Sequence, residues 1–222
     1  MPGSLLQFIA RMCEDYGIDE SHGLKHAIGT MVRAEEILEG IPDIGEEERK
    51  MALYAAALHD TCDHKYTDVK NATDKIKEWL LTYQYWTEKD ADALIHIITT
   101  MSYSQLKRRM VNGNPVYPDH GKWQRAYHIA RHADLLEGYI VARCILYDRH
   151  IYPTKSEDAH WKRAEELFRD RVFTCVSEGW LFMPEALKEV PRLEAEAIRC
   201  LKERSLDWRD ISKLEPFSNT KN

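Results

Sequence analysis

The chain has 222 residues, enough for one domain with a hydrophobic core and further helices around it. Its net charge of −6 argues against a nucleic-acid partner bound along a broad basic face, but leaves room for a small basic pocket. Its five cysteines are scattered without a CxxC pair, as is typical of buried thiols in a reducing compartment. With no signal peptide and no run of about 20 apolar residues, we expect a cytoplasmic protein without a membrane segment.

Apolar residues recur at three- and four-residue steps along most of the chain, which predicts helices throughout. In chain order the expected helices cover residues 24–39, 46–60, 73–85, 89–101, 122–147, 156–176 and 184–204. Pro191 either kinks the last of these or marks its true start. The stretch 104–121 contains Asn-Gly-Asn-Pro and is predicted to be a surface loop long enough for a lid. We find no strand pattern, and the predicted fold class is all-α.

Three short segments carry side chains suited to metal binding. His59 and Asp60 end an Ala-rich helix and offer a nitrogen and a hard oxygen to one cation. His22 and His26 are four residues apart, so they share a helix face. Asp134 lies among Ala and Leu residues, and a carboxylate in such surroundings needs a partner because an unpaired buried charge is costly. A metal ion would be such a partner.

The order His26, His59-Asp60, Asp134 in a helical chain resembles the HD-domain superfamily of metal-dependent phosphohydrolases, in particular its small stand-alone hydrolases. The resemblance covers roughly residues 15 to 150. It is carried by the segments Ser21–His26, Leu58–Lys65, Met101–Ser104 and Ala133–Glu137. It implies an HD-domain-like bundle over residues 1–155. Beyond this part, the sequence itself predicts C-terminal helices on the same core over 156–206 and a polar tail over 207–222.

The resemblance also implies a divalent ion, Mn, Mg or Fe rather than Zn, bound by His26, His59, Asp60 and Asp134. Such an ion polarises a phosphoryl oxygen and lowers the pKa of a bound water. Members of this branch usually have an arginine at the positions of Gly29 and Leu135. Both differences remove a cation, so phosphate recognition must differ here.

Catalytic roles are assigned to Asp60 and to Asp63. Asp63 faces the same site if the helix continues for one more turn, and it would then orient the attacking water or carry its proton. The alternative is a solvated carboxylate at the helix end.

Six residues are candidates for contacts with the substrate or with the metal ligands. They are His22, His64, Lys65, Arg109, His128 and His132. For Lys65 and Arg109 the alternative is an ordinary surface charge. For His128 and His132 it is a solvated polar face of the helix that carries Asp134. His96, which follows two apolar residues, is expected in the core.

The expected function is hydrolysis of a phosphate ester or anhydride, with nucleotides as the favoured small-molecule substrate. Two alternatives stay open. One is a di-iron oxygenase that uses extra histidines at positions 64, 96, 120 and 128. The other is a non-catalytic module that senses a nucleotide. An apolar stripe on the C-terminal helices (Trp161, Ala164, Leu167, Phe168, Val172) fits either a homodimer interface or packing on the core.

Overall fold

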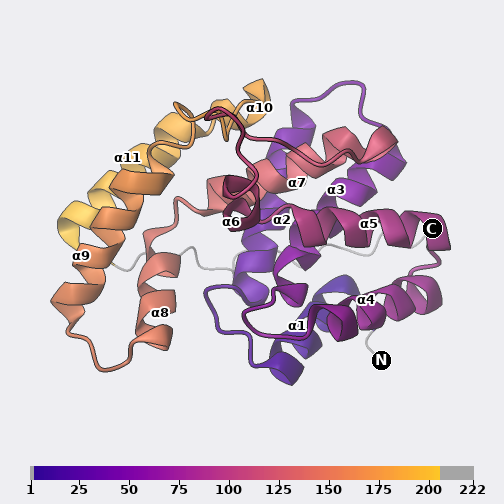
Figure 1. Ribbon diagram of the computed structural model, residues 1–222, viewed down its shortest axis with the longest axis horizontal. Helices are drawn as coiled ribbons and strands as arrows, with labels where there is room; N and C mark the ends of the chain where they lie inside the picture. The colour runs from indigo at the N-terminus through magenta and orange to yellow at the C-terminus, as the bar shows by residue number, and fades with distance from the viewer. Residues whose placement is uncertain (1–2, 206–222) are drawn as a thin grey trace.

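The computed structural model describes residues 3–205 and shows helices and loops without a β-strand in that part of the chain (Figure 1). The all-α prediction is confirmed. The helices are α1 (Leu5–Tyr16), α2 (Leu24–Glu39), α3 (Glu46–Leu58), α4 (Val69–Tyr83), α5 (Glu88–Thr100), α6 (Tyr103–Lys107), α7 (Gln124–Glu137), α8 (Val141–Ile151), α9 (Glu157–Leu167), α10 (Pro184–Leu187) and α11 (Val190–Glu203). Two short 3₁₀ helices, η1 (His59–Cys62) and η2 (Gly121–Trp123), and one π-helical turn, η3 (Phe168–Val172), accompany them.

The centre of the molecule is formed by α2, α3 and α7, which pack against one another. On α3 the small side chains of Ala52, Ala55 and Ala56 are fully buried. Such side chains let neighbouring helices approach closely. Of the predicted metal ligands, His26 lies on α2 and Asp134 on α7, while His59 and Asp60 lie on η1, which follows α3 directly.

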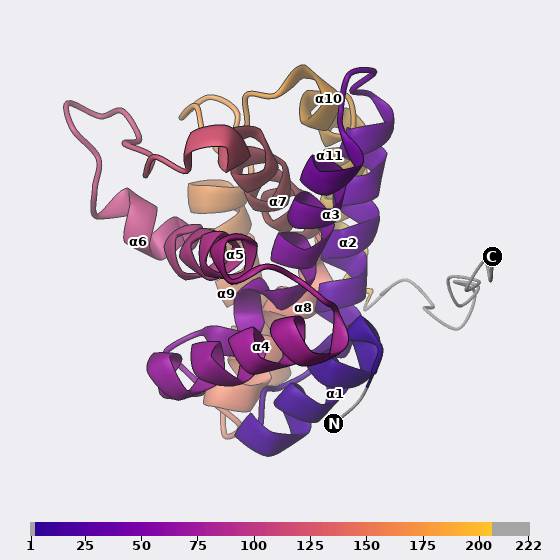
Figure 2. The ribbon, with the colours of Figure 1, turned by 90° about the vertical axis from the view of Figure 1, so that its right-hand side faces the viewer.

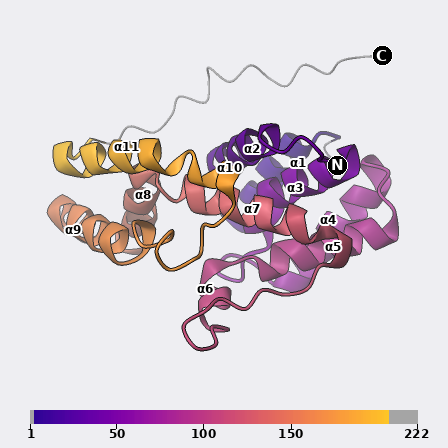
Figure 3. The same cartoon turned by 90° about the horizontal axis from the view of Figure 1, so that it is seen from above.

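The C-terminal helices lie at one end of the molecule, with α4 and α5 at the other (Figure 3). Trp161, Phe168 and Trp180 are buried in the same hydrophobic cluster as the central helices. The apolar stripe is therefore packed within the chain. The predicted polar tail, 207–222, lies outside the described residues.

One long helix was predicted over residues 122–147, and this prediction is wrong. The chain breaks at Gly138, between α7 and α8. A Cβ at Gly138 would lie 2.9 Å from the carbonyl oxygen of Leu135, so the tight turn depends on glycine. The break sets α8 in a new direction, and α8 brings a further cation to the site described below.

Helix α1 was not expected from the sequence. Ser4 caps its start by accepting a hydrogen bond from the backbone N–H of Gln7, and Gly17 ends it at a φ of 63°. Helix α6 (Tyr103–Lys107) overlaps the start of the predicted loop. Figure 2 shows the rest of that loop standing out from the helical body. Pro191 lies in the first turn of α11 and marks its start.

Within residues 3–205, no helix combines the length and the apolar character that crossing a membrane requires.

Candidate metal centre

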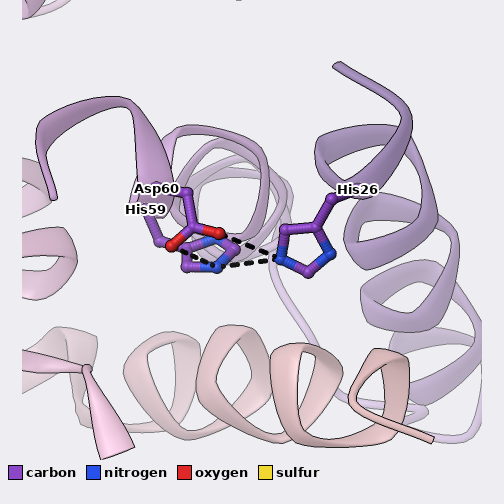
Figure 4. Close-up of side chains that lie close together, drawn as sticks. All are labelled: His26, His59 and Asp60. Atoms are coloured by element: carbon purple, nitrogen blue, oxygen red, sulfur yellow. Dashed lines mark hydrogen bonds and ion pairs between the residues drawn. The ribbon is translucent and has the colours of Figure 1, made fainter. Parts of the chain in front are cut away.

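Two imidazole rings from separate elements meet in the interior of the protein (Figure 4). His26 projects from α2 and is fully buried, and His59 comes from η1. The Nε2 atoms of the two rings are 3.3 Å apart. The Nδ1 atom of His59 lies 2.8 Å from the carbonyl oxygen of Ala56. If Nδ1 donates its proton there, Nε2 of His59 keeps its lone pair for a cation.

Two carboxylates complete the group. Asp60 places one oxygen 3.2 Å from Nε2 of His26 and the other 3.3 Å from Nε2 of His59. Oδ1 of Asp134, on α7, lies 3.4 Å from the Nε2 atoms of both histidines. A cation with bonds of about 2.0–2.2 Å keeps neighbouring ligand atoms roughly 3 Å apart. The donor atoms of His26, His59 and Asp60 could hold a metal ion. Asp134 lies next to this group through its contacts with the two histidines.

The ionised side chains of this cluster stabilise one another's charged forms. Burial by itself would lower the pKa of His59, but Asp60 and Asp134 raise it well above its ordinary value. Burial works against both carboxylates too, yet the histidines hold the pKa of Asp60 and of Asp134 well below the usual range. Without a metal, a proton on His59 therefore serves as the partner of the two carboxylates. A divalent ion would take the place of that proton.

The nearby thiol is not suited to binding the ion. Burial raises the pKa of Cys62 to about 12, and the charges of Asp60 and Asp63 act in the same direction. Its Sγ donates to the carbonyl oxygen of His59 at 3.7 Å. The donor set is therefore made of imidazole nitrogens and carboxylate oxygens. Such ligands suit Mn²⁺ or Fe²⁺ and, for the oxygens, Mg²⁺.

Asp63 does not reach the site by the predicted route. Helix α3 ends at Leu58, and Asp63 follows η1 in an extended conformation. Its carboxylate lies 3.0 Å from Nδ1 of His64 and 3.3 Å from Nζ of Lys65. The helix is thus followed only by the 3₁₀ turn η1, which ends before Asp63, and Asp63 still lines the cavity described next.

A cavity of about 490 Å³ opens beside the cluster and is lined by His59, Asp60 and Asp134. Pockets of this size hold small organic ligands. Of the six proposed contact residues, His22, His64 and Lys65 line it as well. The His22 ring is held by the Ser21 hydroxyl, 2.7 Å away, and by the Tyr66 hydroxyl, 3.0 Å away. These two contacts fix its orientation at the edge of the site.

The other three proposed contact residues do not line the cavity. Arg109 is exposed on the loop after α6. His128 and His132 pack against Phe182, and His132 is fully buried, so the alternative of a solvated helix face is wrong for it. Neither of these histidines faces the metal cluster, because their positions on α7 turn away from the side that carries Asp134.

The histidines invoked for a di-iron site are also spread apart. His96 is exposed rather than in the core, and its ring packs against His120 at 4.4 Å. Neither of them lines the cavity, and His64 is the one residue of that set that does. The structure therefore brings no second group of histidines to the cluster within residues 3–205.

Sequence reasoning missed Arg143, which lies on α8. Its terminal nitrogens are 3.9 Å from an oxygen of Asp60 and 3.8 Å from Oδ1 of Asp134. Its Nε donates to the carbonyl oxygen of Ser21 at 2.7 Å. Because residues 122–147 were predicted as one helix, nothing indicated that Arg143 returns to the site. It supplies a cation where Gly29 and Leu135 do not.

Comparison with known proteins shows the fold alone. No family model and no curated protein matches the chain. A crystal structure of a protein from Lactobacillus plantarum, a structural genomics target, is similar to it with a TM-score of 0.65 and 18% sequence identity. The match covers 90% of this chain and 92% of that one. Fold and site thus define an all-helical protein with a buried cluster of His and Asp residues that could hold a metal ion.

Proposed function

We propose that the protein is a metal-dependent phosphohydrolase that cleaves a phosphate ester or anhydride, with nucleotides as the favoured substrates. The observation that supports this most directly is the cluster of His26, His59 and Asp60, with Asp134 beside both histidines, next to a cavity that His59, Asp60 and Asp134 line. The resemblance to HD-domain hydrolases points to the same four residues.

A divalent ion held by these residues supplies a polarised phosphoryl oxygen and an activated water. Side chains of the protein would bind the phosphoryl oxygens and accept the proton of the water. Arg143 stands beside both carboxylate ligands and offers guanidinium donors to the phosphoryl oxygens. Asp63 offers a carboxylate that lines the same cavity and accepts the proton of the attacking water. His22, fixed by Ser21 and Tyr66, offers a ring nitrogen at the edge of the site.

The test is release of phosphate or pyrophosphate by the Mn²⁺-loaded protein from a nucleotide panel and from p-nitrophenyl phosphate. Asp134→Ala should lose both the bound metal and the activity. Asp74→Ala removes an exposed carboxylate paired with Lys70 and should retain both. Asp63→Asn should retain the metal and lose about 10²-fold or more in rate. A protein shown to hold metal that hydrolyses no phosphate compound would refute the proposal.

A further inference from the structure

The C-terminal helices contribute cations to the same cavity. Arg171, on the π-helical turn η3, lines it, and so does Arg163 on α9. Both lie outside the part of the chain that resembles HD-domain hydrolases. Turns of the π type occur frequently at functional sites, because the wider turn redirects the side chains it carries.

Arg171 is held in place without a carboxylate. Its guanidinium carbon lies 4.1 Å from the centre of the Tyr103 ring, and Tyr103 is buried at the start of α6. In the described part of the chain, no carboxylate lies within ion-pair distance of Arg171. Arg169, two residues earlier, differs in both respects: its Nε is 2.7 Å from Asp170 and its side chain is 70% exposed. Stacking on an aromatic ring leaves the guanidinium donors of Arg171 free for an anion.

Three guanidinium groups share this region of the cavity. Burial raises the pKa of the Cys144 thiol to about 11, and Asp148 acts in the same direction, but Arg163, Arg143 and Arg171 all oppose the rise. All three arginines line the cavity. Cys144 itself lines the cavity.

Among the described residues, the carboxylates of the cavity do not pair with Arg171. Asp148 is engaged by His160 at 2.7 Å and by Lys155 at 3.4 Å. Asp63 is engaged by Lys65 at 3.3 Å. The two carboxylate ligands would be balanced by a divalent ion. With the metal ligands balanced by the ion, Arg171 remains a cation on the cavity wall that has no carboxylate partner among the described residues.

We propose that Arg171, stacked on Tyr103, binds a second anionic group of the substrate, so that the substrate reaches from the metal to the C-terminal helices. This inference rests on the proposed function for the first anionic group. It adds a specificity-determining residue from outside the metal-binding part of the chain. The second group is a phosphate or a carboxylate, since a guanidinium binds either in the same two-pronged geometry.

The test is a binding measurement that needs no turnover. Calorimetry at a fixed free Mn²⁺ concentration compares alkyl phosphonates with alkylene bisphosphonates and with ω-carboxyalkyl phosphonates, over linkers of increasing length. We expect at least one doubly anionic compound to bind the wild type about tenfold or more tightly than the phosphonate of equal length. If the bisphosphonates bind more tightly, the second anionic group is a phosphate. If the ω-carboxyalkyl phosphonates bind more tightly, it is a carboxylate.

In Arg171→Met this preference should disappear, while Arg169→Met should keep it. Thermal denaturation of the ligand-free variants checks that both are folded. A preference that survives in Arg171→Met, or no preference in the wild type at any linker length, would overturn the inference. The turnover assays above are independent of this result. Failure of turnover with a preference that depends on Arg171 would therefore count against the hydrolase alone.

Discussion

The carboxylate of Glu137 occupies the space beside Gly29, and a Cβ added to Gly29 would lie 2.2 Å from its Oε1 atom. Glu137 is 2% exposed, and its Oε2 lies 3.5 Å from Nε of the fully buried Arg33. There is thus no room at position 29 for the arginine that the family resemblance leads one to expect. Helix α7 fills that space with an acidic side chain, and Arg143 comes to the metal cluster from α8 instead.

Gly29→Ala should therefore destabilise the protein by about 1–3 kcal/mol, because the buried carboxylate must move away from Arg33. Urea denaturation measures the loss. In a Glu137→Ala background the same substitution should cost less, since the space is then vacant and Arg33 keeps its contact with Glu36 at 2.8 Å. Gly45→Ala, where a Cβ meets nothing within 4 Å, is the control. Equal costs in the two backgrounds would contradict this account.

Binding of Mn²⁺ should stabilise the protein more at pH 8 than at pH 6. The pKa of His59 is raised in the folded chain by Asp60 and Asp134, so its proton stabilises the metal-free protein fully below pH 6.5. That contribution fades as the pH rises through the folded pKa. The metal competes with the same proton and gains affinity as the pH rises. The midpoint of thermal denaturation, with Mn²⁺ or with a chelator, gives the shift at each pH.

In Asp134→Asn, Mn²⁺ should raise the midpoint of thermal denaturation only slightly at both values of pH, because the charge of one ligand is missing. A shift in the wild type that stays constant or shrinks from pH 6 to pH 8 would speak against a proton on His59 as the group that the metal replaces.

The protein should lose stability as the pH falls from about 6.5 towards 4. Burial lowers the pKa of His132 to about 2, with Arg131 and His128 acting in the same direction, so the folded chain keeps this ring neutral. The unfolded chain protonates the same ring near pH 6.5 and is favoured below that value. Neither ring nitrogen has a hydrogen-bond partner among the described residues. His132→Leu should therefore reduce the loss of unfolding free energy between pH 7 and pH 5.

Urea denaturation at the two values of pH measures the effect. His150→Leu removes an exposed histidine and should leave the pH dependence as it is in the wild type. A His132→Leu protein with the full wild-type pH dependence would show that other groups cause the acid sensitivity.

Phe8→Ala, which removes an aromatic ring from α1, should lower the free energy of unfolding by about 3–5 kcal/mol. The Phe8 ring stacks on Trp79 of α4 with ring centres 4.4 Å apart, and both side chains are buried. Phe8→Ala would leave a cavity between the two helices. Chemical denaturation compares it with Gln7→Ala, an exposed position on the same helix, which should change stability little. A loss below about 1 kcal/mol for Phe8→Ala would mean that α1 contributes little to the core.

Much of the fold follows from local patterns. The spacing of apolar residues predicts α2, α3, α4 and α5 within a few residues, but it merges α7 with α8 and α10 with α11. His59, Asp60 and Asp134 stand out because their chemistry is unusual for their apolar surroundings, and the resemblance to HD-domain hydrolases adds His26 to the set. The structure brings their donor atoms together. Helix α1 escaped notice, although Ser4 and Gly17 are ordinary helix-boundary residues.

Only the tertiary structure decided what surrounds the cluster. The break between α7 and α8 separates Arg143 from the helix of Asp134, and contacts with Asp60, Asp134 and the Ser21 carbonyl place it at the site. The place of Arg171 depends on Tyr103, far away in the chain. A helical period is set by neighbours within a turn, so the sequence displays it. A cavity is formed by side chains that are far apart in the sequence, and the spacing of apolar residues does not indicate which of them will lie close together.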